Sequence, residues 1–434
     1  MIFTNRSRRW PAPHPCVLYR GQTPVVGLHT FRLARLPYWG LTPVLYAIAL
    51  SILIATPAAA QDPHAGHASA PPQVSWSWSW DAKVFFGLNY QLREFTDFHE
   101  VESQNWLMGS GTRPAGAGRI GLNAMLSFEP FTVQALGSPQ VFQTGETYQQ
   151  APLIDYQHPH DLYMSLGGTY ERTVRGARTF LEIDAVGSPA IGPPVFMHRP
   201  SAAENPSSSL SHHMLDSSHI TPGVVTVGAE RAGVKLEGSW FQGLEPDEDR
   251  TDIDFGMLDS WALRGTWQRG PWTAQVSGAQ LTKPEWVEPF YDMARLTASI
   301  AYTRSDGRVA ALVAWGQNRE FHGNLDGYLF EATLRPRARH AWYTRAELVT
   351  KDILGAGGRH PRGFDHFHPL SRVGAFTAGY VYDVAVWRAG RFGLGGDATV
   401  YYVAENLKAN YGSPASFHVF LRYQPKRPSA HTMH

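Results

Sequence analysis

Histidine and aspartate side chains gather in a few short stretches of this sequence. The motif His158-Pro159-His160-Asp161 is one stretch, and His198 lies further along the chain. The candidates in stretch 210–219 are His212, His213, Asp216 and His219. Imidazole nitrogens combined with carboxylates bind Zn, Cu, Ni or Fe. We therefore predict that these residues provide a divalent metal site, with Cu and Zn as candidate ions, although the sequence alone does not identify the cofactor.

The spacing within 210–219 bears on this prediction. If the stretch is helical, His212, Asp216 and His219 lie at i, i+4 and i+7 on one face. His213 and Asp216 are then i, i+3 neighbours. The same side chains could instead cap backbone amides and pack together without any metal. Because the spacing lacks the specificity of an HExxH or zinc-finger pattern, both interpretations stay open.

The elements that must position these side chains are short segments in which apolar and polar residues alternate. In 261–267 one face carries Trp261, Leu263, Gly265 and Trp267, and the other carries Arg264 and Thr266. A period of two predicts β-strands. We predict strands near 83–93, 118–128, 131–138, 160–171, 178–187, 222–231, 233–243, 258–268, 271–281, 294–304, 308–318, 326–336, 340–350, 372–384, 391–404 and 416–424.

The connections between these segments alternate in length. Those within the strand pairs are short, such as Arg231-Ala232 and Arg269-Gly270, whereas 94–117, 139–159 and 188–221 are long. This rhythm predicts an all-β fold, a transmembrane antiparallel up-and-down β-barrel with short periplasmic turns and long extracellular loops. We expect about 16 strands, or 14 if 131–138 is not a strand. A soluble sandwich or propeller would explain the alternation but not the loop lengths.

Polar residues on the opposite strand faces would line a hydrated lumen in a barrel of this size. They are Lys235, Glu237, Arg264, Gln275, Arg345 and Glu347. Oppositely charged side chains among them could narrow the lumen by pairing. The histidine stretches would then lie at the extracellular mouth.

The first 60 residues have the character of a secretory signal peptide. They contain six Arg and no acidic residue, and an apolar stretch ends in Ala58-Ala59-Ala60. Cleavage there would remove Cys16, the single cysteine, and would change the formal net charge from +1 to −5. We predict a signal peptide at 1–60, a flexible periplasmic tail at 61–80, the barrel at 81–424 and a C-terminal tail at 425–434. An acidic exported chain argues against nucleic acid as a partner.

Several motifs of this chain resemble those of a group of uncharacterised Gram-negative outer-membrane β-barrel proteins. They are HPHD at 158–161, MHRPSA at 197–202 and HHxxDSSHI at 212–220. The resemblance implies a barrel and brings no activity with it. A looser likeness to outer-membrane copper-resistance barrels rests on the His-bearing tail and the general plan, although this chain lacks their Met-rich tail.

These observations favour a porin-like channel in the outer membrane of a Gram-negative bacterium, with a His/Asp-rich mouth that binds or passes divalent metal ions. The expected partners are outer-membrane lipid and lipopolysaccharide, the barrel-assembly machinery, and small solutes or metal ions. We predict no catalytic residue, because Ser217, His219 and Asp216 lie too close in sequence for a convincing triad. The alternatives are a lipid-modifying hydrolase with a His/Asp/Ser site at the barrel rim and a non-conducting structural barrel.

Overall fold

The structure is a computed structural model that describes residues 75–149, 151–286, 290–321, 323–354 and 369–426. The predicted signal peptide, most of the 61–80 tail and most of the 425–434 tail lie outside the described residues. Strand β1 begins at Ser77, a few residues before the predicted start of the barrel. No described helix is long and apolar enough to cross a membrane.

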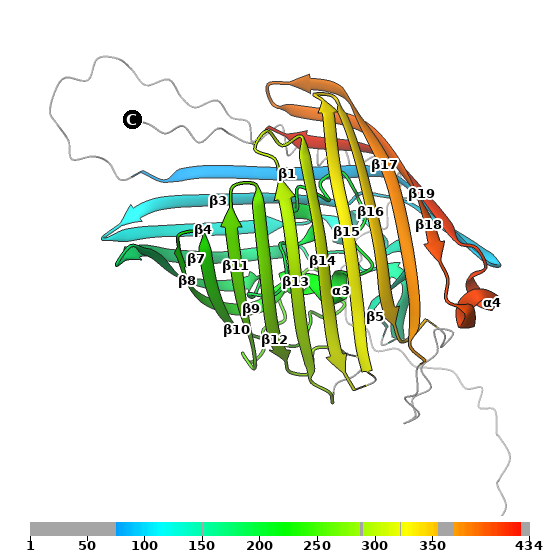
Figure 1. Cartoon of the computed structure of the whole chain (residues 1–434), viewed down its shortest axis with the longest axis horizontal. Helices are drawn as coiled ribbons and strands as arrows, with labels where there is room; N and C mark the ends of the chain where they lie inside the picture. The colour runs from blue at the N-terminus through cyan, green and yellow to red at the C-terminus, as the bar shows by residue number, and fades with distance from the viewer. Residues whose placement is uncertain (1–74, 150, 287–289, 322, 355–368, 427–434) are drawn as a thin grey trace, which may run out of the picture. The chain divides into compact units, whose positions relative to one another are not determined.

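One closed antiparallel sheet makes up the barrel. Its strands in chain order are β1 (Ser77–Arg93), β2 (Thr96–Glu102), β3 (Asn105–Ala115), β4 (Gly118–Leu126), β7 (Tyr163–Val174), β8 (Ala177–Gly187), β9 (Thr221–Arg231), β10 (Val234–Phe241), β11 (Ser260–Arg269), β12 (Trp272–Leu281), β13 (Met293–Thr303), β14 (Val309–Glu320), β15 (Gly323–Arg337), β16 (His340–Lys351), β17 (Ser371–Trp387), β18 (Gly390–Tyr402) and β19 (Ala415–Pro425). Figure 1 shows β11 to β16 lying side by side.

Strands β2 and β3 pair with the two halves of β1 and together form one position in the wall, so the barrel has 16 strand positions. The barrel closes where β1 pairs with β19, from Val84↔Tyr423 to Leu92↔Ala415. Closure pairs the backbone groups of both edge strands, as a strand that crosses lipid requires. The fold predicted from the alternating segments is therefore confirmed.

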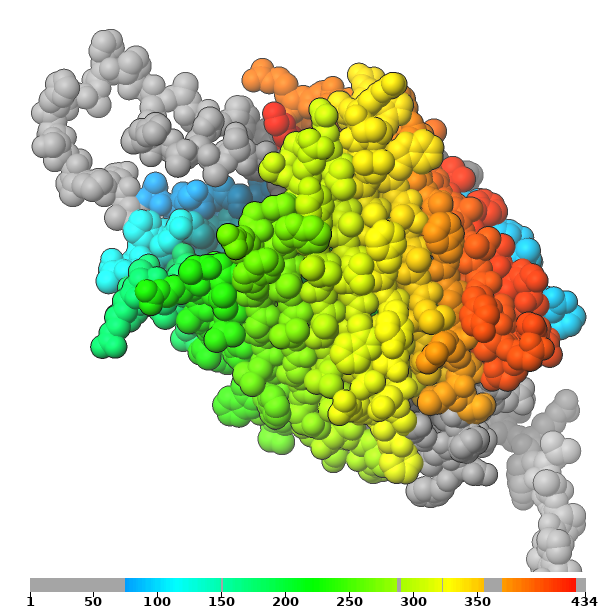
Figure 2. Space-filling model, in the orientation of Figure 1, coloured from blue at the N-terminus to red at the C-terminus, as the bar shows by residue number. Residues whose placement is uncertain are grey.

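The two faces of the wall differ as the alternation predicts. Large apolar side chains such as Trp261, Leu263 and Val276 are exposed on the outside. Glu237, Gln275, Arg345 and Glu347 face inward, as predicted, but they are buried instead of lining an open hydrated lumen. Lys235 and Arg264 both bind Glu237, with N to O distances of 2.9 Å. Figure 2 shows the outer surface over β10 to β17, whose exposed apolar side chains suit contact with lipid.

Two predicted elements are wrong. Segment 131–138 is not a strand: the short helix α2 (Glu129–Thr132) occupies its start, and 131–138 pairs with no barrel strand. Segment 94–117 is not a long loop, because it holds β2 and β3 with a tight turn before them. The predicted long loop at 139–159 instead contains a separate hairpin of β5 (Ser138–Tyr148) and β6 (Ala151–Gln157).

Two of the long connections are rich in buried polar residues. We call 127–162, which holds α2, β5 and β6, the hairpin loop, and 188–220 the plug loop. The plug loop contains η1 (Phe196–His198), α3 (His212–Leu215) and η2 (Ser217–His219). A third connection, between β18 and β19, holds η3 (Glu405–Leu407) and α4 (Lys408–Tyr411).

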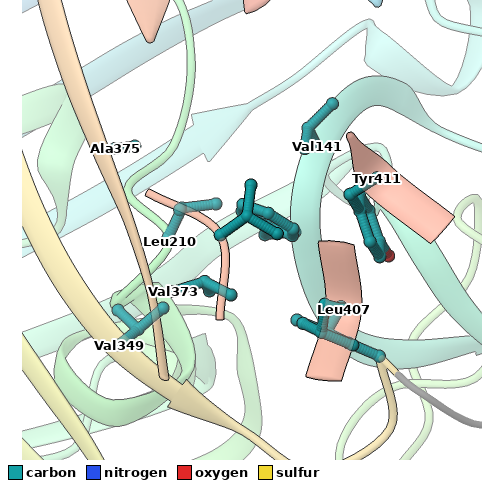
Figure 3. Packing of buried hydrophobic residues seen from close by; sticks show 10 residues of the cluster. Val141, Leu210, Val349, Val373, Ala375, Leu407 and Tyr411 are labelled. Carbon is teal, nitrogen blue, oxygen red and sulfur yellow. The ribbon is translucent and has the colours of Figure 1, made fainter. Parts of the chain in front are cut away.

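A buried apolar cluster joins these connections to the wall (Figure 3). Val141 comes from the hairpin loop, Leu210 from the plug loop, and Leu407 from the β18–β19 connection. Val349 and Val373 come from β16 and β17. All five are less than 2% exposed, so both loops are packed against the inside of the barrel as a core packs, rather than extending away from it.

Candidate functional site

The plug loop is held by inward side chains from many strands. Ser239 of β10 accepts from the Ala190 N–H at 2.7 Å, and Ser277 of β12 accepts from the Gly192 N–H at 2.9 Å. Further contacts join Lys83 of β1 to Ala203, Arg264 of β11 to Gly192, Arg295 of β13 to Ser217 and Ser218, and Arg345 of β16 to Ser207 and Ser208. Because its contacts come from so much of the circumference, the plug loop crosses the lumen.

Small residues let the plug loop approach the wall closely. Gly316 of β14 and Gly327 of β15 are directly opposite each other in the sheet. A Cβ atom at Gly316 would lie 2.2 Å from the Met214 carbonyl oxygen, and one at Gly327 would lie 2.9 Å from the Ser211 Cβ. Helix α3 therefore packs directly on backbone at these two positions, which fixes where its histidines lie.

An ion-pair group anchors the base of α3. Arg199 donates from Nε to Glu331 of β15 at 2.6 Å and also binds Asp216. His212 Nδ1 lies 2.7 Å from the other oxygen of Asp216. Burial alone would raise the pKa of Asp216, but Arg199 and then His212 hold that pKa below its ordinary value. Asp216 is therefore an ionised carboxylate that fixes the orientation of the His212 ring.

Five histidines form a closed ring of imidazoles between the hairpin loop and the plug loop. Neighbouring ring centroids are 6.5 Å apart for His158 and His160, 5.3 Å for His160 and His219, and 5.3 Å for His219 and His212. The ring closes through His212 and His213 at 5.4 Å, and His213 and His158 at 6.4 Å. We call this group the histidine ring. It brings together sequence stretches far apart along the chain.

Burial sets the charge of several of these imidazoles. Burial, followed by the neighbouring His212, lowers the pKa of His213 and of His219 well below the ordinary value of 6.5. Burial also lowers the pKa of His212, against the opposing effect of Asp216. For His160 burial acts in the same direction, but Glu129 outweighs it and raises the pKa. Three of the rings are thus neutral at pH 7, which is the form of imidazole that binds metals.

One part of the histidine ring has the spacing of a metal site. Ligand atoms of Glu146, His158 and His213 all lie within 4.8 Å of one another. Glu146 Oε1 is 2.8 Å from His158 Nε2, and its other oxygen accepts from Arg250 at 3.3 Å. Burial opposes ionisation of Glu146, but His158 and Arg250 hold its pKa far below the ordinary value. One anionic oxygen and two imidazoles can bind a divalent transition metal ion.

Two small cavities flank the histidine ring. The first, of about 40 Å³, adjoins Glu146 and His213 and is also lined by Glu285, Glu320 and Asp352 from the loop ends of the strands. The second, of about 30 Å³, adjoins His160 and Glu129. It lies deeper, because its lining includes Lys83 and Phe85 near the middle of β1. Each is large enough for at least one water molecule.

The structure brings six of the eight predicted site residues together. They are His158, His160, His212, His213 and His219 in the histidine ring and Asp216 beside it. Asp161 instead accepts from Arg250 at 3.2 Å. His198 packs on Trp106 at 4.9 Å and lies 3.4 Å from the Met125 sulfur, away from the ring.

The predicted helical face is wrong beyond Asp216. Helix α3 ends at Leu215, and Asp216 has φ −144°, so His219 does not continue the same face. His219 Nδ1 instead lies 3.0 Å from the Asp216 backbone oxygen. The i, i+4 pair of His212 and Asp216 forms, while no contact links His213 to Asp216 among the described hydrogen bonds and ion pairs.

Sequence reasoning missed the carboxylates that complete the site, Glu129 and Glu146. Glu129 lies just before the segment 131–138 that was predicted to be a strand, and Glu146 lies in the predicted long loop 139–159. Neither stands beside a histidine in the sequence. The segment that contains Glu146, Ser138–Tyr148, does not alternate, so it gave no strand signal. Nothing local could have indicated its position next to His213.

The serine, histidine and aspartate of 216–219 do not form a relay. The Asp216 carboxylate binds Arg199 and His212, and His219 bonds the backbone of Asp216. Arg295 donates to the hydroxyls of Ser217 and Ser218 at 3.0 Å each. In a working triad the histidine would bond both the serine hydroxyl and the carboxylate.

No protein-family model matches this chain, and no curated protein matches it. Among solved structures it is similar to an anion-selective porin from Comamonas acidovorans, with 12% identity, a TM-score of 0.47, and coverage of 80% of this chain and 99% of that chain. It is also similar to a loop L8 deletion mutant of OmpT, an outer membrane protein of Vibrio cholerae, with 8% identity, a TM-score of 0.45 and coverage of 80% and 99%. The resemblance to uncharacterised outer-membrane proteins stays a prediction.

Proposed function

We propose that this protein is a porin-like barrel of the Gram-negative outer membrane that binds a divalent transition metal ion, Cu²⁺ or Zn²⁺, inside its lumen. The observation that carries the proposal is the group of Glu146, His158 and His213, whose ligand atoms lie within 4.8 Å of one another. Outer-membrane lipid, lipopolysaccharide and the barrel-assembly machinery are the partners that this location implies.

The surroundings of the group support metal capture from the loop side of the barrel. The cavity beside Glu146 and His213 is lined by three further carboxylates, Glu285, Glu320 and Asp352, and by one cation, Lys351. Carboxylates that outnumber cations raise the local concentration of divalent cations. With the long loops facing outward, as in barrels of this plan, the ion arrives from the cell exterior.

The plug loop argues for capture rather than free diffusion of the ion. Its anchors span the lumen from β1 to β16, and the lining of the deeper cavity includes the ammonium of Lys83. Beyond it, Glu204 of the plug loop binds Arg335 and Arg422, which places more cations on that side. A metal cation that leaves in this direction meets repulsion, so its residence at the histidines is favoured. Passage of metal then requires movement of the plug loop.

The test is metal analysis of the purified, refolded barrel after chelation, dialysis against Zn²⁺ and removal of unbound ion. We expect the wild-type protein to retain Zn²⁺ and Glu146→Gln and His213→Ala to lose most of their affinity. His99→Ala is the matched control, because His99 lies exposed on β2 away from the site. Circular dichroism of each variant checks that the barrel has formed.

Absence of retained metal in the folded wild-type barrel contradicts the proposal. Retention that is unchanged in Glu146→Gln and His213→Ala contradicts the assigned ligands. Planar-bilayer recordings add a second measurement, since a plugged barrel is expected to conduct weakly.

A further inference from the structure

We propose that the histidine ring contains a second metal seat, formed by His160, His212 and His219, into which an ion passes from the seat at Glu146, His158 and His213. We call these the inner and the outer seat. The inner seat deepens the proposed function and rests on it.

The spacing of the rings is the first support. His219 lies centrally, with its ring centroid 5.3 Å from that of His160 and 5.3 Å from that of His212. Two imidazoles that bind one tetrahedral ion through nitrogens about 2 Å from the metal have centroids about 5 Å apart. The central ring of His219 therefore already stands from each of its two neighbours at the separation that a shared ion imposes.

The hydrogen bonds of the three rings are the second support. Each ring uses Nδ1 for an anchor: His160 with Glu129 Oε2 at 2.8 Å, His212 with Asp216 Oδ1 at 2.7 Å, and His219 with the Asp216 carbonyl at 3.0 Å. A metal-binding histidine commonly donates its other ring nitrogen to a carboxylate or backbone carbonyl, which fixes the ring and strengthens it as a ligand. All three rings show that pattern and keep Nε2 for a metal.

His219 Nε2 is the third support. This nitrogen is fully buried and has no hydrogen-bond partner, while the residue as a whole is 9% exposed. A buried polar atom without a partner costs free energy, and most are satisfied by protein, water or an ion. Since Nδ1 of the same ring is already bonded, an ion at Nε2 satisfies the ring completely.

The two seats differ in how closely their ligand atoms already converge. Within the described part of the chain, the outer seat meets the 4.8 Å spacing of ligand atoms, and the three inner histidines do not meet it together. The inner rings must rotate before their nitrogens converge on an ion. This rotation makes binding at the inner seat less favourable than binding at the outer seat. We therefore expect the outer seat to fill first and the inner seat to bind more weakly.

The arrangement also gives a direction of movement. The outer seat adjoins the cavity lined by Glu285 and Asp352, and the inner seat adjoins the deeper cavity through His160. His212 and His213 are consecutive residues with ring centroids 5.4 Å apart, one in each seat. An ion can thus be handed from His213 to His212 without returning to bulk water.

The experiment is a titration of the chelated, refolded barrel with Co²⁺, followed by its visible absorption and by metal analysis. We expect wild type and the His99→Ala control to bind two ions per chain, the second more weakly. His219→Ala is expected to keep only the tight ion, and His213→Ala only the weak one. With Cu²⁺ at two equivalents, the electron paramagnetic resonance spectrum should show magnetic coupling between two neighbouring ions.

The outcomes separate this inference from the proposed function. One ion per chain, lost in His213→Ala and unaffected by His219→Ala, overturns the inner seat and leaves the outer site intact. Two ions without magnetic coupling overturn the adjacency of the seats. No bound ion overturns both. Because His219→Ala could loosen the plug loop, His160→Gln provides an independent test, with the same loss of the weak ion expected.

Discussion

The plug loop makes two buried contacts of opposite character, one with the barrel wall at Glu204 and one with the hairpin loop at the histidine ring. At Glu204, a carboxylate with no exposed surface binds Arg335 and Arg422, and Arg422 binds Asp383 in turn. At the histidine ring, buried imidazoles outnumber charged partners, and His219 keeps an unpaired nitrogen. Burial is common to both, so what differs is charge pairing: Glu204, Arg422 and Asp383 each have an oppositely charged partner. The paired charges around Glu204 are those expected of a structural anchor. The histidine ring instead keeps a nitrogen that can bind a ligand, as expected of a binding site.

The strongest test of this comparison is to remove an anchor. Arg199→Ala leaves Asp216 buried without its guanidinium partner and leaves Glu331 with Arg345 alone, at 3.6 Å. Removing one member of a buried ion pair costs about 3–5 kcal/mol, because the remaining charge is uncompensated. We expect release of the plug loop, measured as a rise in single-channel conductance and faster proteolysis within 188–220. Arg119→Ala, at an exposed ion pair, is the control and should leave both unchanged.

A smaller effect is expected from the group that orients a ligand. Glu129→Gln removes the carboxylate beside His160 Nδ1 while the ring stays in place. Loss of such an orienting partner lowers metal affinity by about 10–100-fold. The affinity for the weaker ion in a Zn²⁺ competition titration is the measurement. An unchanged affinity together with unchanged stability would show that Glu129 serves packing alone.

The close approach of α3 to the wall gives a third test. Gly316→Ala places a methyl group against the Met214 carbonyl and should displace α3, at a cost of about 1–3 kcal/mol. Gly265→Ala is the matched control, because its Cβ would meet side-chain atoms no nearer than 3.6 Å on the outer face. We expect metal affinity to fall in Gly316→Ala alone. Equal affinities in the two variants would mean that α3 adjusts without moving its histidines.

The mildest change is one of pH. Because the pKa values of His212, His213 and His219 are lowered, the unfolded chain binds more protons than the native one below the ordinary value of 6.5. Retention of the plug loop therefore weakens as pH falls below 6.5. His160, with a raised pKa, opposes this, since its contribution is present at low pH and is lost as pH rises through its folded pKa. Three histidines have a lowered pKa and one has a raised pKa, so we expect proteolysis of 188–220 to be faster in acid. At neutral pH, bound Zn²⁺ should slow this proteolysis.

The alternation of the sequence was sufficient to predict most of the barrel, and its failures have identifiable causes. The wall position formed by β2 and β3 was missed because its outer face carries Asp97, His99 and glycines instead of a continuous apolar row. The pairing also shifts at Ser103 and Gln104, which breaks the period of two. Conversely, apolar and polar residues alternate in 131–138, but no barrel strand pairs with this segment. Alternation indicates a possible strand and does not show that a pairing partner exists.

The sequence was sufficient to predict which histidines form the candidate site. It was not sufficient to predict how the two loops bring them together with Glu129 and Glu146. Residue type and clustering indicated His158, His160, His212, His213 and His219, because such groups are rare without a purpose in binding or packing. The Glu146 and Glu129 contacts depend on how two loops fold into the lumen, which no local pattern encodes. The helix likewise ends at Leu215, next to the contact of Met214 with Gly316, and no pattern within 210–219 predicts that contact.

The last strand of the chain also has a part in seating the plug loop. Arg422 of β19 is completely buried against Glu204, and His418 of the same strand lies 3.4 Å from the Ser207 hydroxyl. The strand that seals the cylinder against β1 thus also supplies one of the two guanidinium groups that bind Glu204. Opening this seam would therefore also unfasten the contents of the cylinder.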